Sequence, residues 1–190
     1  MQKRLFSFVS FFTFILFFSF YSVVFSQDEI RKSPKAGVTQ HIGASTDITI
    51  SYSRPGVKER TVWGELVPYG MTQGKDRLIP WRAGANENTT FETSTDILVE
   101  GKELKAGKYG LHMIPEKDEW TIIFSNNNSS WGSYSYNPDE DALRVKVKPQ
   151  DAGFQEWLLY GFDNLSDTSA TAFLQWEKLK VPFKITVPAQ

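Results

Sequence analysis

The feature that most constrains this fold is a period-two alternation of apolar and polar side chains, which recurs in three separate parts of the chain. The clearest segments are residues 47–53, 143–147 and 179–187. Their apolar members are Ile48, Ile50 and Tyr52, then Leu143, Val145 and Val147, then Leu179, Val181, Phe183, Ile185 and Val187. Because successive side chains of a strand point to opposite faces, this pattern predicts half-buried antiparallel strands.

Short turn signals separate further runs of β-branched and aromatic residues. The hairpins expected from them join 97–99 to 103–104, and 109–114 to 120–124 through a loop at Pro115–Asp118. No window carries a sustained apolar stripe at helical spacing, apart from a single turn around Trp63–Leu66. Trp120, Trp157 and Trp176 lie in strand-like runs and are expected in the core or at its rim. The fold predicted is all-β, a single antiparallel β-sandwich, with jelly-roll connections as one option.

The N-terminus has the character of an export signal. Lys3 and Arg4 precede an apolar run from Leu5 to Phe25, and polar residues follow Ser26. Cleavage after Ser26 is expected, and the alternative is a retained membrane anchor, because the run approaches the roughly 20 residues that cross a bilayer. The organisation predicted is a signal peptide over 1–26, a flexible lead-in over 27–37 and one β-sandwich domain over 38–190.

Charge and cysteine content exclude several classes of protein. The chain has 21 basic and 22 acidic residues and a formal charge of −1 at pH 7, which argues against nucleic acid as a partner. It has no cysteine, so disulfides and thiol catalysis are excluded and stability depends on packing. The expected location is periplasmic or extracellular, with membrane contact only through the N-terminal segment if that segment is not cleaved.

No cofactor or metal is expected from the motifs. The glycines and lysine of Gly70–Asp76 depart from a phosphate loop in spacing, and an aspartate stands where a hydroxyl would hold magnesium. A metal site built from His41 and His112 with Glu65 or Glu87 is an alternative that spacing neither supports nor excludes.

One stretch, residues 54–88, breaks the alternating pattern. It has no clean strand, and it combines six basic residues with Trp63, Tyr69 and Trp81. A long irregular segment inside a compact domain is usually functional or conceals an element, and the aromatic content argues against disorder. We expect this segment to pack over one end or face of the sandwich.

The most informative motif in this segment is Trp81–Glu87, with the sequence WRAGANE. Its small central residues allow the backbone to approach another surface closely. Arg82 supplies a planar set of donors, Asn86 supplies donors and acceptors, and Glu87 supplies acceptors. This mixture suits a polyhydroxylated or carboxylated ligand. The structural alternative is that Arg82 pairs with Glu87 or Glu65 and ties the segment to the sandwich.

The leading hypothesis is a non-enzymatic cell-envelope module that binds a small polar molecule or a glycan where 54–88 meets 109–114 and 131–136. The candidate ligand-binding residues are Arg82, Asn86, Glu87, His112, Trp63, Trp81, Tyr69, Trp131 and Tyr134. The first alternative is an envelope hydrolase that uses Glu65, Glu87 or His112. The second is a purely structural or protein-interaction domain in which 54–88 serves as a plug.

Several motifs, taken in order, also resemble a known family. They are Tyr52-Ser53-Arg54-Pro55, Trp63–Gly70, Trp81–Glu87, Lys105–Tyr109, Trp131–Tyr136 and Leu143–Val147. Over roughly residues 33–163 the chain resembles an exported bacterial family called domain of unknown function 2911. Met71–Pro80 looks like an insertion relative to the usual link. The resemblance implies export and an all-β fold, and it supplies no activity.

Overall fold

The computed structural model describes residues 30–188, and the residues from Arg31 onward belong to one compact unit. The predicted signal peptide and the first residues of the predicted lead-in lie outside the described range. Within the described range, no helix is long and apolar enough to cross a bilayer. The prediction of export therefore stays a prediction.

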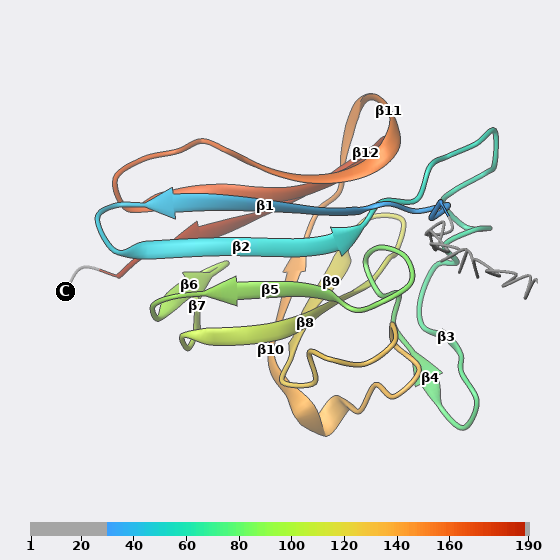
Figure 1. Ribbon diagram of the computed structural model, residues 1–190, viewed down its shortest axis with the longest axis horizontal. Coiled ribbons are helices and arrows are strands. Elements are labelled where there is room, and N and C mark those ends of the chain that lie inside the picture. Colours follow the sequence, from blue (N-terminus) through green and yellow to red (C-terminus); the bar gives the residue numbers. More distant parts are fainter. Residues whose placement is uncertain (1–29, 189–190) are drawn as a thin grey trace, which may run out of the picture. The chain divides into compact units, whose positions relative to one another are not determined.

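The domain is an antiparallel β-sandwich, which confirms the predicted fold class (Figure 1). One sheet has the order β1-β2-β5-β8-β9-β10, and the second has the order β11-β12-β6-β7. The first sheet comprises β1 (Lys35–Ile42), β2 (Thr46–Ser53), β5 (Thr89–Thr93), β8 (Gly107–Ile114), β9 (Trp120–Ser125) and β10 (Asp141–Val147). The second comprises β6 (Ile97–Val99), β7 (Lys102–Leu104), β11 (Gln150–Asp163) and β12 (Ser169–Thr186). A small third sheet pairs β3 (Thr72–Gln73) with β4 (Leu78–Ile79), and one 3₁₀ turn, η1, spans Pro138–Glu140.

The inward faces of the strands follow the alternation in the sequence. In β2, Ile48, Ile50 and Tyr52 are all buried. In β12 the buried positions are even-numbered up to Trp176 and odd-numbered from Val181 onward. Glu177 lies between these runs with a φ of +56°, and the pairing with β11 is irregular nearby. A local bulge of this kind reverses which side chains face the core.

Aromatic contacts join the two sheets across the core. Phe91 of β5 and Phe124 of β9 pack edge to face at 5.0 Å, measured between ring centroids. Phe183 of β12, in the other sheet, lies 6.3 Å from Phe91 and 6.2 Å from Phe124. All three side chains are buried. Since perpendicular aromatic pairs add to the benefit of burial, this cluster helps to hold the sheets face to face.

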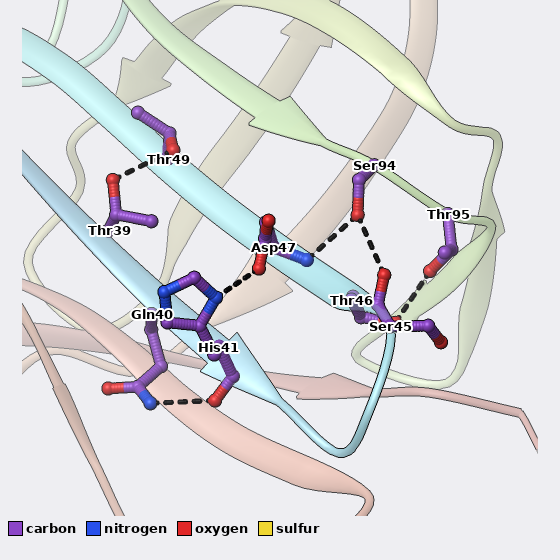
Figure 2. A network of polar contacts seen from close by, with 9 residues as sticks. All are labelled: Thr39, Gln40, His41, Ser45, Thr46, Asp47, Thr49, Ser94 and Thr95. Carbon is purple, nitrogen blue, oxygen red and sulfur yellow. Dashed lines mark hydrogen bonds and ion pairs between the residues drawn. The ribbon is translucent and has the colours of Figure 1, made fainter.

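The tip of the β1–β2 hairpin is held by short polar contacts to the turn after β5 (Figure 2). The backbone N–H of Asp47 donates to Ser94 Oγ at 2.8 Å, and the hydroxyls of Thr46 and Thr95 lie 2.7 Å apart. His41 Nδ1 pairs with the Asp47 carboxylate on the exposed side of the hairpin. These contacts tie the edge strand β1 to the interior of its sheet.

The structure also contains strands that the sequence pattern did not reveal. β1 begins at Lys35, inside the stretch expected to be a lead-in, and most of its side chains are exposed or half-buried. β11 is long, but its register with β12 shifts twice, so no regular alternation marks it. The turn around Trp63–Leu66 is not helical. Periodicity identifies a strand only where one face is consistently buried.

Candidate functional site

The irregular segment 54–88 is attached to the sandwich by backbone contacts at both ends, as expected. Near its start, the N–H of Val57 donates to Glu156 O at 2.9 Å, and the N–H of Leu158 donates to Pro55 O at 3.0 Å. Near its end, Trp81 and Met113 exchange two backbone hydrogen bonds of 2.9 Å. The segment therefore contacts β11 on one side and β8 on the other.

Two tryptophans of this segment, Trp63 and Trp81, form one cluster with Trp120 of β9 and Trp176 of β12. The centroid of Trp63 lies 5.8 Å from Trp81, 5.0 Å from Trp120 and 5.6 Å from Trp176, each time at a steep angle. Trp120 and Trp176 are fully buried, which confirms their predicted place in the core, whereas Trp63 and Trp81 are half-buried. The cluster gives the segment a rigid aromatic base.

A pocket of about 480 Å³ opens above this cluster. Its apolar lining comes from Pro55, Leu66, Val67, Trp81, Ala85 and Trp176. Its charged lining consists of four basic residues: Lys32, Lys58, Arg60 and Arg82. Within the described residues, the lining contains no aspartate or glutamate, and none of the four cations lies within ion-pair distance of a carboxylate. The pocket thus combines an indole surface with a positive rim.

Two backbone stretches beside the pocket adopt a conformation that ordinary residues rarely use. Lys58 and Glu59 have φ values of +48° and +59° in a tight turn closed by a 3.1 Å bond from Arg60 N to Val57 O. Ala83 and Asn86 have φ values of +51° and +61°. Residues held in the left-handed region cost free energy, and the same conformation recurs outside the pocket at Glu100, Asn164 and Glu177.

The turn at Ala83 is held from below by two buried hydroxyls. The carbonyl of Ala83 accepts hydrogen bonds from Tyr160 Oη at 2.8 Å and from Thr89 Oγ1 at 3.1 Å. Tyr160 itself packs edge to face against Tyr52, with 4.8 Å between ring centroids. These contacts fix the backbone that carries Arg82 before any ligand is present.

Arg82 is placed by contacts to the loop after β9. Its Nη1 donates to Asn86 O at 2.7 Å, and its guanidinium lies 5.0 Å from the centroid of the Tyr134 ring. It also packs against Gly132, where a Cβ atom would overlap the guanidinium. Arg82 therefore forms no pair with Glu65 or Glu87, so the expected tie between this arginine and a glutamate is not how the segment is anchored.

Glu87 is anchored on the other side of the motif. Its carboxylate accepts from Arg31 Nη2 at 2.6 Å and from Ser53 Oγ at 3.2 Å, with Lys35 Nζ at 3.5 Å. The hydrogen bond from Arg31 is the main reason that the pKa of Glu87 falls to about 2. Glu87 lines a separate small cavity of about 160 Å³ and not the tryptophan-floored pocket.

His112 lies in the interior of β8 and is 2% exposed. Its Nδ1 is 2.8 Å from Ser133 Oγ, and its ring packs edge to face with Tyr136 at 5.5 Å. Burial, with a smaller contribution from the positive charge of Arg82, lowers the pKa of His112 from 6.5 to about 4. The imidazole is therefore neutral at pH 7 and is a packed part of the core.

The structure brings together only some of the residues proposed from the sequence. Trp81 and Arg82 line the pocket, Tyr134 and Asn86 contact Arg82, and Trp63 supports Trp81 from below. Glu87 and His112 do not line it, and Tyr69 and Trp131 are exposed side chains outside it. Sequence reasoning missed Lys32, Lys58, Arg60 and Trp176 as pocket residues. The basic content of 54–88 was the available signal for Lys58 and Arg60.

The residues named for the alternative metal and hydrolase sites do not come together in the structure. His41 lies at the exposed tip of the β1–β2 hairpin beside Asp47 (Figure 2), whereas His112 is inside β8. Within the described part of the chain, no three His, Asp or Glu side chains gather as a metal site would require. Glu65 is exposed, and Glu87 is engaged by Arg31.

A second, open groove of about 610 Å³ lies between the end of β10 and β12. Four lysines and three acids line it, and two of the lysines are paired: Lys146 Nζ lies 2.6 Å from Glu119 Oε1, and Lys180 pairs with Asp163. Glu100 accepts from the backbone N–H of Lys184 at 2.5 Å. Its charge is thus largely balanced within the groove, unlike that of the tryptophan-floored pocket.

Comparison with known proteins gives one family. A family model described as "Protein of unknown function (DUF2911)" matches residues 33–185, which is most of the chain. The match confirms the resemblance seen in the motifs and extends it from residue 163 through most of β12. No curated protein and no solved structure matches the chain.

Proposed function

We propose that this chain, which belongs to the DUF2911 family of proteins of unknown function, is a non-enzymatic module that binds a small polar molecule in the pocket above Trp81. The observation that carries the proposal is a preformed pocket with an aromatic floor and a few converging polar groups. A volume of about 480 Å³ lies within the range common for small-molecule sites.

Binding is favoured over catalysis by the chemistry of the lining. The pocket offers lysines, arginines, indoles and one hydroxyl, that of Ser33. Among its described lining residues there is no histidine or carboxylate that could move a proton at neutral pH. The two groups named for a hydrolase are placed elsewhere: Glu87 is held ionised by Arg31, and His112 is buried.

The proposal includes an exported location, which rests on the apolar N-terminal run and the residues around Ser26. Fractionation of the native host, followed by intact-mass measurement of the protein, tests it. A periplasmic or secreted species that begins after Ser26 supports cleavage. A membrane-bound species of full mass supports a retained anchor instead.

A thermal-shift screen of the purified protein tests the binding function. The panel contains neutral sugars, organic anions, organic cations and zwitterions. A ligand present at 100 times its dissociation constant adds about 2.7 kcal/mol to the stability of the native state, which is readily measured as a rise in Tm. Loss of the shift in Trp81→Phe, with the melt of the unliganded variant near that of the parent, places the ligand at this pocket.

The control for this screen is Trp131→Phe. Trp131 is 58% exposed and does not line the pocket, so the variant is expected to keep the shift. The binding proposal fails if no class in the panel stabilises the protein. The assignment to this pocket fails if Trp81→Phe responds to the ligand as the parent does.

A further inference from the structure

We infer that the ligand of this pocket is a small organic anion with a flat apolar part, of the class of aromatic carboxylates and aromatic phosphates; this inference rests on the proposed binding function. It goes beyond that function because it specifies the charge and shape of the ligand. It also disfavours the neutral glycan that the sequence left open.

The charge argument begins with four cationic side chains that converge on one concave surface. Lys32, Lys58, Arg60 and Arg82 line the pocket together, and within the described residues no carboxylate lies at ion-pair distance from any of them. A concave site lined by charges of one sign attracts counter-ions more strongly than a flat surface does. An anionic ligand is the simplest group that balances this charge.

The positions of three of these cations are set by the protein. Arg60 donates from Nε to Val57 O at 3.0 Å and from Nη2 to Gly56 O at 2.6 Å. The guanidinium of Arg82 is held against Tyr134 and Gly132, and its Nη1 donates to Asn86 O at 2.7 Å. Lys58 extends beside Trp157, with Nζ 5.4 Å from the ring centroid. Preorganised cations of this kind lose little freedom when an anion binds, and a guanidinium is suited to the paired oxygens of a carboxylate or phosphate.

One carboxylate stands beside the rim without lining the pocket. Glu156 Oε1 accepts from the backbone N–H of Lys58 at 3.0 Å and so supports the left-handed turn. Its negative charge opposes the potential of the rim. Glu156→Gln keeps an oxygen acceptor for the backbone N–H of Lys58 and removes the negative charge. This variant is therefore expected to strengthen anion binding, whereas removal of a rim cation is expected to weaken it.

The apolar part of the ligand follows from the floor of the pocket. Trp81 is half-buried and offers part of its indole to the cavity, while Trp176 is buried beneath it and nearly parallel to it. Leu66 and Val67 close one side. Such a surface favours a flat ring or a similar apolar face through stacking and burial.

Neutral sugars need a different lining. Their hydroxyl groups both donate and accept, so they are held by amides, which do both, and by carboxylates, which accept. Among the described residues, the lining has no Asn, Gln, Asp or Glu, and its cations can only donate. The same indole floor would stack on a sugar ring, so the charged rim is what separates the two ligand classes.

Isothermal titration with matched probes tests the inference. The probes are 2-naphthoate and 2-naphthyl phosphate, the neutral amide 2-naphthamide, acetate as an anion without a ring, and a neutral trisaccharide. We expect the two naphthyl anions to bind at least about tenfold more tightly than the amide, acetate and the sugar, since charge-assisted hydrogen bonds are stronger than neutral ones. The affinity for the anions is expected to fall as sodium chloride rises, because Lys32, Lys58 and Arg60 are solvent-exposed.

Charge variants locate the effect. Lys58→Gln and Arg82→Gln are each expected to weaken binding of 2-naphthoate by about five- to tenfold, and Glu156→Gln to strengthen it. Lys117→Gln is the matched control, because Lys117 is exposed and lies in the loop between β8 and β9, outside the pocket lining. Circular dichroism and the unliganded melt show that each variant is folded.

The outcomes separate this inference from the proposed function. If the amide or the neutral sugar binds as well as the naphthyl anions, or if only neutral or cationic compounds stabilise the protein in the screen, the anion assignment is wrong and binding stands. If Lys117→Gln weakens 2-naphthoate as much as Arg82→Gln does, the anion is not bound at this pocket. If nothing binds in either experiment, the proposed function itself fails.

Discussion

The indole rings of Trp81 and Trp176 are nearly parallel, with 16° between their planes and 6.2 Å between their centroids. The first belongs to the irregular segment 54–88 and the second to the middle of β12. Their contact joins the segment to the sandwich and forms the floor of the proposed site. A substitution at this contact is therefore expected to change both the stability of the protein and the proposed binding.

Trp176→Phe is expected to destabilise the protein by about 2 kcal/mol. The substitution leaves a cavity in a closely packed site and removes the hydrogen bond from Nε1 to Glu156 O, which is 3.1 Å long. Trp157→Phe is the matched control and is expected to cost less than about 1 kcal/mol, because Trp157 is only half-buried. Urea unfolding measures both, and equal losses would contradict the assigned role of Trp176 as the buried support of the pocket.

Stability is expected to fall between pH 6.5 and pH 4 because of His112. Burial, aided by the charge of Arg82, lowers the pKa of His112 from 6.5 to about 4, so in this range the unfolded chain binds a proton that the folded protein does not. The loss at pH 4 is on the order of 3 kcal/mol and is absent above pH 7, where both states are neutral.

The measurement is the free energy of unfolding of the parent and of His112→Asn across this pH range. The asparagine keeps a polar group near Ser133 and does not titrate. The variant is expected to be less stable at pH 7 and to show a shallower decline toward pH 4. A decline as steep as that of the parent would assign the effect to other groups.

Glu87→Gln is expected to lower stability at pH 7 by less than about 1 kcal/mol, since its side chain is 35% exposed and its ion pairs are screened by solvent. The hydrogen bond from Arg31 lowers the pKa of Glu87 to about 2. This contribution is therefore complete above the ordinary glutamate pKa of 4.5 and disappears as the pH falls toward 2. Unfolding curves at pH 7 and pH 3 should show a smaller difference between variant and parent at the lower pH. If the variant and the parent differ by the same free energy of unfolding at pH 7 and pH 3, the ion pair with Arg31 is not the source of the stability that Glu87 contributes.

Gly132→Ala is expected to displace Arg82. A Cβ at this position would overlap the guanidinium, and Gly132 has a φ of +63°, which adds a backbone cost of about 1–2 kcal/mol for alanine. Gly153→Ala is the control, because nothing lies within 4 Å of the added Cβ in β11. We expect a lower Tm and a loss of ligand response in Gly132→Ala alone. A normal response in that variant would mean that the present position of Arg82 is not needed for binding.

Much of the fold could be predicted from the sequence because the physical signal is local. Burial of one strand face leaves a period-two pattern, and this pattern predicted β2, β10 and the second half of β12. The hairpins β6–β7 and β8–β9 were predicted from their turns. The pattern failed for β1, an edge strand with few buried side chains, and for β11, whose bulges shift the alternation.

The candidate site was predictable only in outline. The motif Trp81–Glu87 pointed to segment 54–88, and it supplies Trp81 and Arg82 to the pocket. Glu87, at the end of the motif, pairs with Arg31 and does not line the pocket. His112 is buried in the core and does not line the pocket either. Trp176 looked like an ordinary core residue, and its part in the pocket floor depends on a contact with Trp81 across a large sequence separation.

By itself, the sequence determined that extended strands would pair and bury one face, because side-chain direction within a strand depends only on position along the chain. It also determined the family and the excess of cations and aromatic residues in 54–88. Only the tertiary structure decided which cations remain without an acidic partner and which indoles meet. Those outcomes depend on distances between residues far apart in the chain, and such distances are set by packing of the two sheets and not by any local pattern.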